Sequence, residues 1–598
     1  MAQYHAPLRD MRFVLEELAD LPGVGRLPGC EEAALDVVYT ILEEANKFAG
    51  GVLVPLNAIG DRLGCRWEDG RVSTPVGWSE AYRRFREAGW VGLSLPKEYG
   101  GQGLPKVVAT AVWEMWFSAN LAFAMVPQLN NGQAEAFLLA ASDKLKTAYL
   151  SKIVSGEWAA TMNLTESQAG SDLAATRTRA QPQADDSYRI FGQKIFISYG
   201  EHDLTENIIH LVLARLPDAP PGVKGISLFV VPKRLLNADG TLGMHNDVRC
   251  IAIERKMGIH ASPTCTMSYG ERDGAVGFLV GEPNRGLEYM FIMMNDARFG
   301  VGVQGFALGE TAYQHALAYA HERIQGRDAV NGQNNVPIIR HPDVKRMLLA
   351  MRARIMASRM LAYTVAGWYD RMHHDPNPAM ATKCHRYVDL LMPVIKGWCA
   401  ELGNEVADIA IQVFGGSGFV EETGVAQVRR DARIITIYEG TTGIQANDLV
   451  GRKVLREGAQ TLQRLTAEMR EIADDLLAAE DLRSQGRVLN ADLDVLEQTT
   501  QWILANGQER LADVLAVAVP FLHLLGTICG SWQMGRAALA AREKLTQDND
   551  AYYRGIVDLA RFWFTHNAPQ VSSLCRVIRD GGPALTGFDP RALDLQRL

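Results

Sequence analysis

The sequence predicts an α+β protein in which a β domain stands between helical domains. Apolar residues recur at three- and four-residue spacing near residues 33–42, which is the period of a helix, and helical patterns resume after residue 286. Between these regions, short runs rich in β-branched and aromatic residues are separated by turns, which is typical of strands. These runs are residues 188–191, 195–197, 208–213 and 226–231. A chain of 598 residues is also too long for a single core, so several domains are expected.

Five segments are expected in chain order. An N-terminal extension with one amphipathic piece at 11–18 precedes a helical domain, which a Gly- and Pro-rich loop at 95–105 interrupts. The β domain follows, then a second helical domain and an extra helical domain. We place these segments at residues 1–35, 36–158, 159–280, 281–455 and 456–598.

Composition and charge exclude several functions. The net charge of −8 offers no basic footprint for nucleic acid. Eight cysteines are scattered without a Cys-x-x-Cys pair, so we expect reduced thiols, no disulfide framework and no metal site. The first residues show no signal or transit pattern, and residues 594–598 fall short of a Ser-Lys-Leu address. A cytoplasmic enzyme is therefore expected.

One apolar run, at residues 514–532, is long enough to cross a bilayer. It contains Pro520 and His523 and follows Asp513, so a helix buried in a helical domain is the preferred interpretation. Membrane-surface contact through residues 456–598 stays open as an alternative, which liposome flotation of that segment would test.

Glu439 is the strongest candidate for a catalytic group. It follows an apolar run at 434–437 and stands in the segment IYEGTTGIQ at 437–445. A base that takes a proton from carbon needs little water around it and a raised pKa. Gly440 permits close approach of a ligand to the backbone, and the threonines offer hydroxyls. Alone, the segment also fits a helix start or a turn.

Three further segments stand in the same order as in one known family. They are TMNLTESQAGSD at 161–172, GQKIFIS at 192–198 and QVFGGSGF at 412–419. Together with 437–445 they resemble the motifs of acyl-CoA dehydrogenases. The resemblance implies a helical domain, a β domain and a four-helix-bundle-type domain that carries the base. It also implies FAD as cofactor, α,β-dehydrogenation of an acyl-CoA thioester to the trans-2-enoyl-CoA, and electron-transfer flavoprotein as electron acceptor.

The resemblance also assigns flavin contacts residue by residue. Met162, Leu164 and Thr165 would meet the isoalloxazine ring, and Ser171 would lie near a phosphate or the CoA chain. Phe196 would stack on the ring, with Ser198 hydrogen-bonded near it. The remaining FAD contacts would be Thr441 and Gly443, with Arg323, Gln412 and Gly416 directed at the FAD of a partner subunit.

The same resemblance places substrate contacts on two segments. Asn295 and Arg298 would line the substrate channel, and Gly440 would lie against the thioester. Glu439 would be the base, although Asp296 is close to the channel residues in sequence. The Glu439 backbone N–H and a ribityl hydroxyl of FAD would hold the thioester oxygen as charge develops on it.

A G-x-G-x-x-G sequence at 300–305 does not predict a dinucleotide site. That fingerprint requires a strand before it and a helix that opens at it. Residues 293–298 before it continue a helical pattern, so these glycines are interpreted as sites of close helix packing. NAD is not expected as a cofactor.

The sequence leaves the acyl group open. The extra domain resembles that of the longer subgroup, which includes very-long-chain enzymes and 3-(methylthio)propionyl-CoA dehydrogenases. We expect medium or long fatty acyl chains, with 3-(methylthio)propionyl-CoA as the alternative, and a homodimer. Two alternative functions stay open: an acyl-CoA oxidase that uses oxygen, and a non-catalytic acyl-CoA-binding protein.

Overall fold

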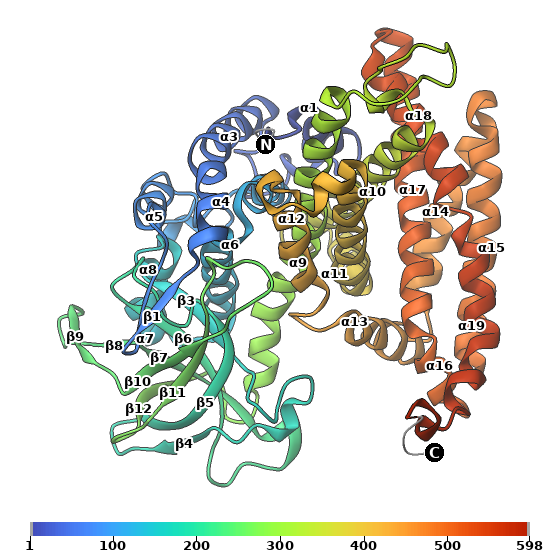
Figure 1. Ribbon diagram of the computed structural model, residues 1–598. Coiled ribbons are helices and arrows are strands. Elements are labelled where there is room, and N and C mark those ends of the chain that lie inside the picture. Colours follow the sequence, from blue (N-terminus) through green and yellow to red (C-terminus); the bar gives the residue numbers. More distant parts are fainter. Residues whose placement is uncertain (1–3, 595–598) are drawn as a thin grey trace.

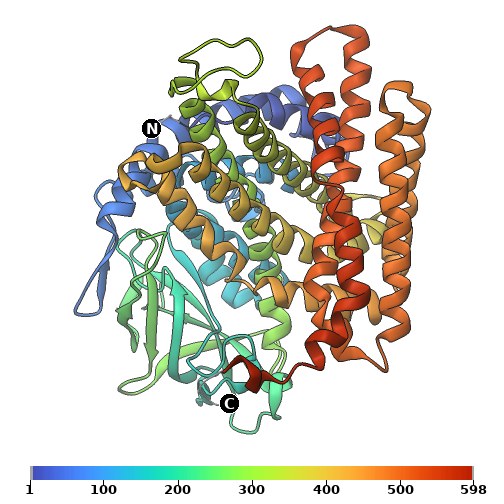
Figure 2. The same ribbon diagram turned by 45° about the vertical axis from the view of Figure 1, so that its right-hand side comes forward.

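A computed structural model describes residues 4–594. The strands gather in one region beside a large helical body, and the last helices form a column on the opposite side of that body (Figure 1). Turning the molecule shows the long helices of the body running side by side between the two (Figure 2). The predicted α+β class, with helical, β and helical regions in that order, is confirmed.

The N-terminal region is helical, and its longest helix is almost wholly buried. Its helices are α1 Leu8–Glu17, α2 Leu21–Val24, α3 Leu35–Phe48, α4 Val54–Leu63, α5 Trp78–Glu87, α6 Lys106–Ala140, α7 Asp143–Leu145 and α8 Ser151–Val154. In residues 4–594, α6 alone is long and apolar enough to cross a membrane, but 94% of its apolar window is buried inside the protein. Helix α6 breaks at Asn120, whose φ of −163° and ψ of 90° are not helical.

A small hairpin in this region was not predicted. Strands β1 (Arg66–Glu68) and β2 (Arg71–Ser73) pair antiparallel across Asp69 and Gly70. Both turn residues have positive φ, 43° and 82°. Asp-Gly is a strong signal for this kind of tight turn, so the sequence did carry the information.

The middle region is an eight-stranded sheet. Its strands are β3 Ala159–Asn163, β4 Arg179–Pro182, β5 Tyr188–Ser198, β6 Ile208–Arg215, β7 Ile226–Pro232, β10 Val248–Ile253, β11 Thr264–Tyr269 and β12 Ala275–Val280. The spatial order is β10-β11-β5-β12-β7-β6-β3, and β4 pairs with β5 and β6. Strands β8 (Arg234–Leu236) and β9 (Leu242–His245) form a separate hairpin. The first two predicted runs are one long strand, β5.

The second helical region packs helices at very short range. It contains α9 Gly286–Glu322, α10 Pro342–His374, α11 Pro378–Phe414, α12 Val425–Ala432 and α13 Thr442–Asp448. A Cβ at Gly302 would lie 2.6 Å from the Ile395 carbonyl oxygen, and one at Gly305 would lie 2.3 Å from that of Cys399. The G-x-G-x-x-G sequence therefore lies inside one helix, as predicted, and Gly302 and Gly305 let α9 approach α11 closely.

The extra C-terminal region is a bundle built around one buried helix. Its helices are α14 Gln460–Ala478, α15 Arg483–Asn506, α16 Leu511–Ala516, α17 Ala518–Gln547, α18 Ala551–His566 and α19 Gln570–Thr586. Most of the apolar run at 514–532 belongs to α17, whose residues there are largely buried. The prediction of a buried helix is confirmed. Residues 595–598, on which the comparison with a peroxisomal address partly depended, lie outside the described residues.

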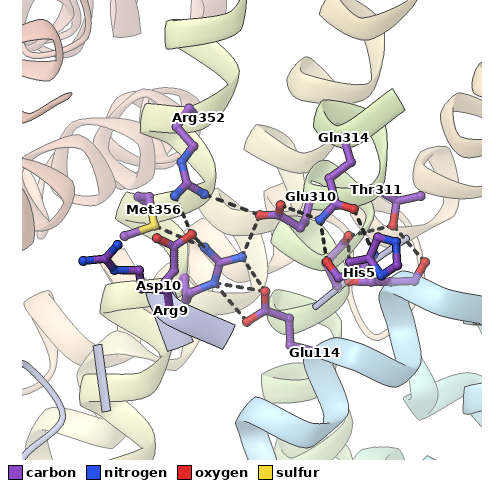
Figure 3. A network of polar contacts seen from close by, with 12 residues as sticks. His5, Arg9, Asp10, Glu114, Glu310, Thr311, Gln314, Arg352 and Met356 are labelled. Atoms are coloured by element: carbon purple, nitrogen blue, oxygen red, sulfur yellow. Dashed lines mark hydrogen bonds and ion pairs between the residues drawn. The ribbon is translucent and has the colours of Figure 1, made fainter. Parts of the chain in front are cut away.

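A buried network of charges ties the N-terminal extension to the helical body (Figure 3). Arg359 is fully buried and donates to Glu114 at 2.6 Å and to Glu310 at 2.8 Å. Asp10 of α1 is 3% exposed and accepts a hydrogen bond from Arg352. Buried charges require partners of this kind, since loss of one leaves the other uncompensated. The network therefore fixes α1 against α6, α9 and α10.

Candidate active site

A cavity of about 70 Å³ lies where the sheet meets the helical body. Four of the predicted site residues line it: Met162, Phe196, Ser198 and Glu439. They come from β3, β5 and the turn before α13, which lie far apart in sequence. The fold thus brings three of the predicted flavin contacts and the predicted base to one cavity.

Glu439 stands on a strained turn. Its φ is +57° and that of Gly440 is +90°, so two successive residues adopt left-handed backbone. The Gln445 side chain donates to the Glu439 carbonyl at 3.0 Å, and the Thr441 hydroxyl caps α13 by accepting from the Ile444 N–H. The interpretation of the segment as a turn is therefore correct for its backbone, and a positive φ is uncommon for a residue other than glycine.

Burial and two cations set the charge of Glu439. Burial raises its pKa to about 7, and this rise is opposed by the positive charges of Arg298 and Lys396. Burial also lowers the pKa of Lys396 to about 8. The Lys396 ammonium donates to the Gly440 carbonyl at 2.6 Å. A carboxylate with a pKa near neutrality can accept a proton and release it again under physiological conditions.

Sequence reasoning missed Lys396. It lies in the middle of α11 with Val394, Ile395 and Trp398 as apolar, buried neighbours. A lone cation in an apolar stretch of helix was the available signal, because such a charge needs a partner when buried.

Arg298 and Asn295 lie together on α9, but neither lines the cavity, so their assignment to the substrate channel stays a prediction. Arg298 is 7% exposed, burial lowers its pKa, and its Nη1 donates to the Asn295 side-chain oxygen at 3.4 Å. Its Nε finds no acceptor within residues 4–594 and is buried. Asp296, by contrast, accepts a hydrogen bond from Lys106. It is therefore engaged as an ion pair and does not line the cavity.

The flavin-side segments are locked to each other by a buried ion pair. The Lys194 ammonium donates to the Leu164 carbonyl at 3.0 Å and to Glu166 at 2.8 Å. The Ile195 N–H donates to the Thr165 carbonyl at 2.9 Å. Burial opposes the ionisation of Glu166, but Lys194 and several hydrogen bonds hold its pKa at about 2.

The cavity wall fits the flat ring system of a flavin. Phe196 is 59% exposed although it belongs to a strand, and its φ is +59°. An aromatic face left uncovered beside Met162 and Ser198 offers stacking area and a nearby hydroxyl. The residues present are thus of the kind that hold an isoalloxazine ring.

The other predicted FAD contacts do not line this cavity. Leu164 and Thr165 lie in the loop after β3, Ser171 is exposed in the same loop, and Thr441 and Gly443 lie at the start of α13. The residues assigned to a partner's FAD are Arg323, Gln412 and Gly416, all of which are exposed. A Cβ at Gly416 would meet nothing within 4 Å. Their roles stay predictions. No group of three or more metal-binding side chains occurs within residues 4–594.

Sequence profiles of four domains of one family match the chain. They are the N-terminal, middle and C-terminal domains of acyl-CoA dehydrogenase at 41–157, 161–271 and 284–455, and an acetyl-CoA dehydrogenase C-terminal-like domain at 465–589. The chain belongs to the acyl-CoA dehydrogenase family. As a member of this family it is an FAD-dependent enzyme that acts on acyl-CoA thioesters.

Curated relatives match this acyl-CoA dehydrogenase over nearly its whole length. It is 49% identical to the 3-methylmercaptopropionyl-CoA dehydrogenase of Ruegeria pomeroyi, over 92% of this chain and 93% of the relative. It is 33% identical to a butyryl-CoA dehydrogenase of Syntrophomonas wolfei, with 96% and 97% covered. The broad-specificity linear acyl-CoA dehydrogenase of Mycobacterium tuberculosis is also 33% identical, with 97% and 98% covered.

Solved structures share the fold of this acyl-CoA dehydrogenase. The FAD complex of the Bacillus anthracis acyl-CoA dehydrogenase superposes with a TM-score of 0.75 at 20% identity, covering 98% of this chain and 93% of the other. The butyryl-CoA dehydrogenase of Megasphaera elsdenii gives a TM-score of 0.57 at 23% identity, covering 70% and 98%. The shorter enzyme matches only part of this longer chain.

Proposed function

We propose that the enzyme oxidises 3-(methylthio)propionyl-CoA to the corresponding α,β-unsaturated thioester. The observation that carries this proposal is the 49% identity, over nearly the full length of both chains, to an enzyme named for that substrate. The expectation of medium or long fatty acyl chains is thereby replaced by the alternative that the sequence had left open.

The wall of the cavity suits an acyl group that carries a thioether. Three methionines, Met125, Met162 and Met293, contribute to this wall. Methionine side chains are polarizable and adapt to irregular shapes, which suits contact with a methylthio group. Butyryl and 3-(methylthio)propionyl groups are similar in length, which agrees with the butyryl-CoA dehydrogenase at 33% identity.

In the proposed reaction Glu439 removes the proton from the carbon next to the thioester carbonyl. Bound FAD supplies the acceptor for the hydride that leaves the β-carbon, so the substrate loses one proton and one hydride. Because Glu439 has a pKa of about 7, it is partly ionised at neutral pH and is a stronger base than an ordinary carboxylate.

The chain also offers groups that orient the base and the thioester. Lys396 and Arg298 favour the ionised form of Glu439 before the proton is taken. Lys396 holds the Gly440 carbonyl, which fixes the turn that would lie against the thioester. The Glu439 backbone N–H is the proposed donor to the thioester oxygen, and a donor of this kind contributes about 3–4 kcal/mol to stabilisation of the transition state.

We further propose electron-transfer flavoprotein as the acceptor of the two electrons, and a homodimer as the working assembly. The exposed Arg323, Gln412 and Gly416 are available to reach FAD in a second subunit. Sedimentation with and without FAD would measure the assembly. Peroxide formation in air, faster than electron-transfer flavoprotein is reduced, would instead favour an oxidase.

Anaerobic mixing with a panel of acyl-CoAs tests the substrate. The panel runs from butyryl-CoA to palmitoyl-CoA and includes 3-(methylthio)propionyl-CoA. We expect fastest bleaching of the flavin by 3-(methylthio)propionyl-CoA, and almost no bleaching in Glu439→Gln, which retains FAD. Fastest bleaching by a long-chain substrate would contradict the proposed acyl group, and near-normal bleaching in Glu439→Gln would contradict the assigned base.

A further inference from the structure

The extra C-terminal bundle reaches the supports of the turn that carries Glu439. Helix α13 begins directly after this turn and runs from the helical body toward the last helices (Figure 1). Helix α17 of the bundle packs against both α13 and α11. These two helices hold the turn, since Lys396 of α11 donates to its backbone and so does Gln445 of α13. The bundle is therefore in contact with both supports of the candidate base.

Leu522 of α17 lies at the point where the two supports meet. Gly397 follows Lys396 on α11. A Cβ at Gly397 would lie 2.6 Å from a methyl carbon of Leu522 and 3.5 Å from the Gln445 Cβ. Leu522 is fully buried and fills the space that the glycine leaves open, in keeping with the close packing of protein interiors. Leu522 and Gln445 thus lie over the same spot on α11, one residue from Lys396.

Packing has to hold the Gln445 side chain, because its hydrogen bonds do not fix both ends of the amide. The amide nitrogen donates to the Glu439 carbonyl at 3.0 Å. The amide oxygen is buried and finds no donor within residues 4–594. A buried polar group without a partner favours any movement that would satisfy it. The orientation that serves Glu439 therefore depends on the surrounding side chains, and Leu522 is placed to maintain it.

Helix α17 also fixes α11 through Trp398, which is almost wholly buried. A Cβ at Gly526 would lie 2.3 Å from the Trp398 ring, and one at Gly530 would lie 3.0 Å from it. Leu522, Gly526 and Gly530 follow one another at four-residue intervals, so they share one face of α17. Pro393 lies inside α11 and removes one hydrogen bond of that helix. Support from α17 therefore falls on a segment of α11 that has lost part of its own.

We propose that the extra domain positions the candidate base, with Leu522 of α17 keeping Gln445 and α11 in the places from which they hold the backbone of Glu439. Leu522 is a positioning residue, since it does not line the cavity beside Glu439. The inference rests on the part of the proposed function in which Glu439 takes the substrate proton. It gives the extra domain a part in the reaction.

The test measures the rate of flavin reduction at saturating butyryl-CoA or 3-(methylthio)propionyl-CoA in the full-length, FAD-loaded enzyme. Leu522→Ala opens a space beside Gln445, and we expect the rate to fall at least about tenfold, because a small misplacement of a catalytic group is costly. The dissociation constants of FAD and of the butenoyl-CoA product should stay within about threefold of the wild type, since only the base is misplaced. Leu522→Met keeps the volume of the side chain and should retain the rate within about threefold. An unchanged rate in Leu522→Ala overturns the inference.

A double-mutant cycle shows whether Leu522 acts through Gln445. Gln445→Met removes the donor to the Glu439 carbonyl and keeps a side chain of similar size, so it too should slow flavin reduction. If the two residues act together, the loss in the Leu522→Ala, Gln445→Met double variant falls well short of the product of the two single losses. Losses that multiply would show two independent effects and overturn the inference.

A control in the same bundle separates positioning from general loss of stability. Leu489 of α15 is as fully buried as Leu522 and lies one turn from Gly486, which packs on the end of α14. Leu489→Ala should lower the thermal midpoint as Leu522→Ala does, but leave the rate of flavin reduction unchanged. An equal loss of rate in Leu489→Ala overturns the inference. If Leu522→Ala does not retain FAD, the milder Leu522→Val takes its place and should slow flavin reduction at least about threefold, and no slowing overturns the inference.

The two proposals fail in different ways. If no acyl-CoA bleaches the wild-type flavin, or if Glu439→Gln is bleached normally, the proposed function fails and there is no base for the extra domain to position. If Glu439→Gln is inactive but Leu522→Ala keeps the wild-type rate, the function stands and only the role of the extra domain is refuted.

Discussion

The rate of flavin reduction is expected to fall steeply as the pH is lowered below 7, because only ionised Glu439 can accept the substrate proton. With a pKa of about 7, roughly nine-tenths of the carboxyl groups are ionised at pH 8 but only about one-tenth at pH 6. The rate should therefore drop about tenfold between these values. A carboxyl with an ordinary pKa near 4.4 would lose only a few per cent over the same range.

Anaerobic stopped-flow measurement of bleaching between pH 5 and 9 would show this dependence without interference from the electron acceptor. Lys396→Met removes a charge that lowers the pKa of Glu439, so the midpoint should move to higher pH. Lys396→Arg keeps the charge and should leave the midpoint closer to that of the wild type. A rate that stays level from pH 8 to pH 5, or a midpoint that falls in Lys396→Met, would refute the reasoning.

Three further substitutions test the supporting structure. Lys194→Met leaves Glu166 buried without its cation, which should cost about 3–5 kcal/mol and raise the dissociation constant of FAD, measured by flavin fluorescence. Asp10→Asn weakens the buried charge network and should lower stability by about 3 kcal/mol, seen as an earlier urea midpoint. Gly305→Ala places a Cβ 2.3 Å from the Cys399 carbonyl oxygen, and this overpacking should cost about 1–3 kcal/mol, measured by thermal unfolding.

Each of these variants has a matched control in the chain. Lys47→Met removes an exposed ion pair with Glu44, and Asp343→Asn removes an exposed one with Arg346, so both should behave almost as the wild type does. Gly51→Ala adds a Cβ that meets nothing within 4 Å. If a test variant and its control lose the same amount of stability or FAD affinity, the loss does not come from the burial of the substituted residue.

The turn that carries the proposed base could be predicted because its signal is local. Glu439, Gly440 and the threonines are neighbours in sequence, and an acidic residue in that setting already suggested a base. The β domain could be predicted for the same reason, since strand periodicity is a property of short segments. The hairpin at Asp69 and Gly70 has an equally local signal, the Asp-Gly pair itself, although the hairpin was not predicted.

The surroundings of the base could not be predicted in the same way. Lys396 reaches the Gly440 carbonyl only because α11 packs beside the turn before α13. Gln128 and Gln304 are 176 residues apart and meet through the packing of α6 on α9. Contacts of this kind depend on three-dimensional packing, which the spacing of residues along the chain does not specify.

The contacts of α1 have a consequence for the order in which the protein is made. Asp10 accepts a hydrogen bond at 2.9 Å from the Tyr552 hydroxyl of α18, and Arg9 pairs with Asp550. Domains generally fold in the order in which the ribosome releases them. The first helix, however, gains these partners only after more than five hundred further residues have been synthesised. Chains that stop before α18 would therefore leave the amphipathic helix α1 without two of its polar partners, Tyr552 and Asp550.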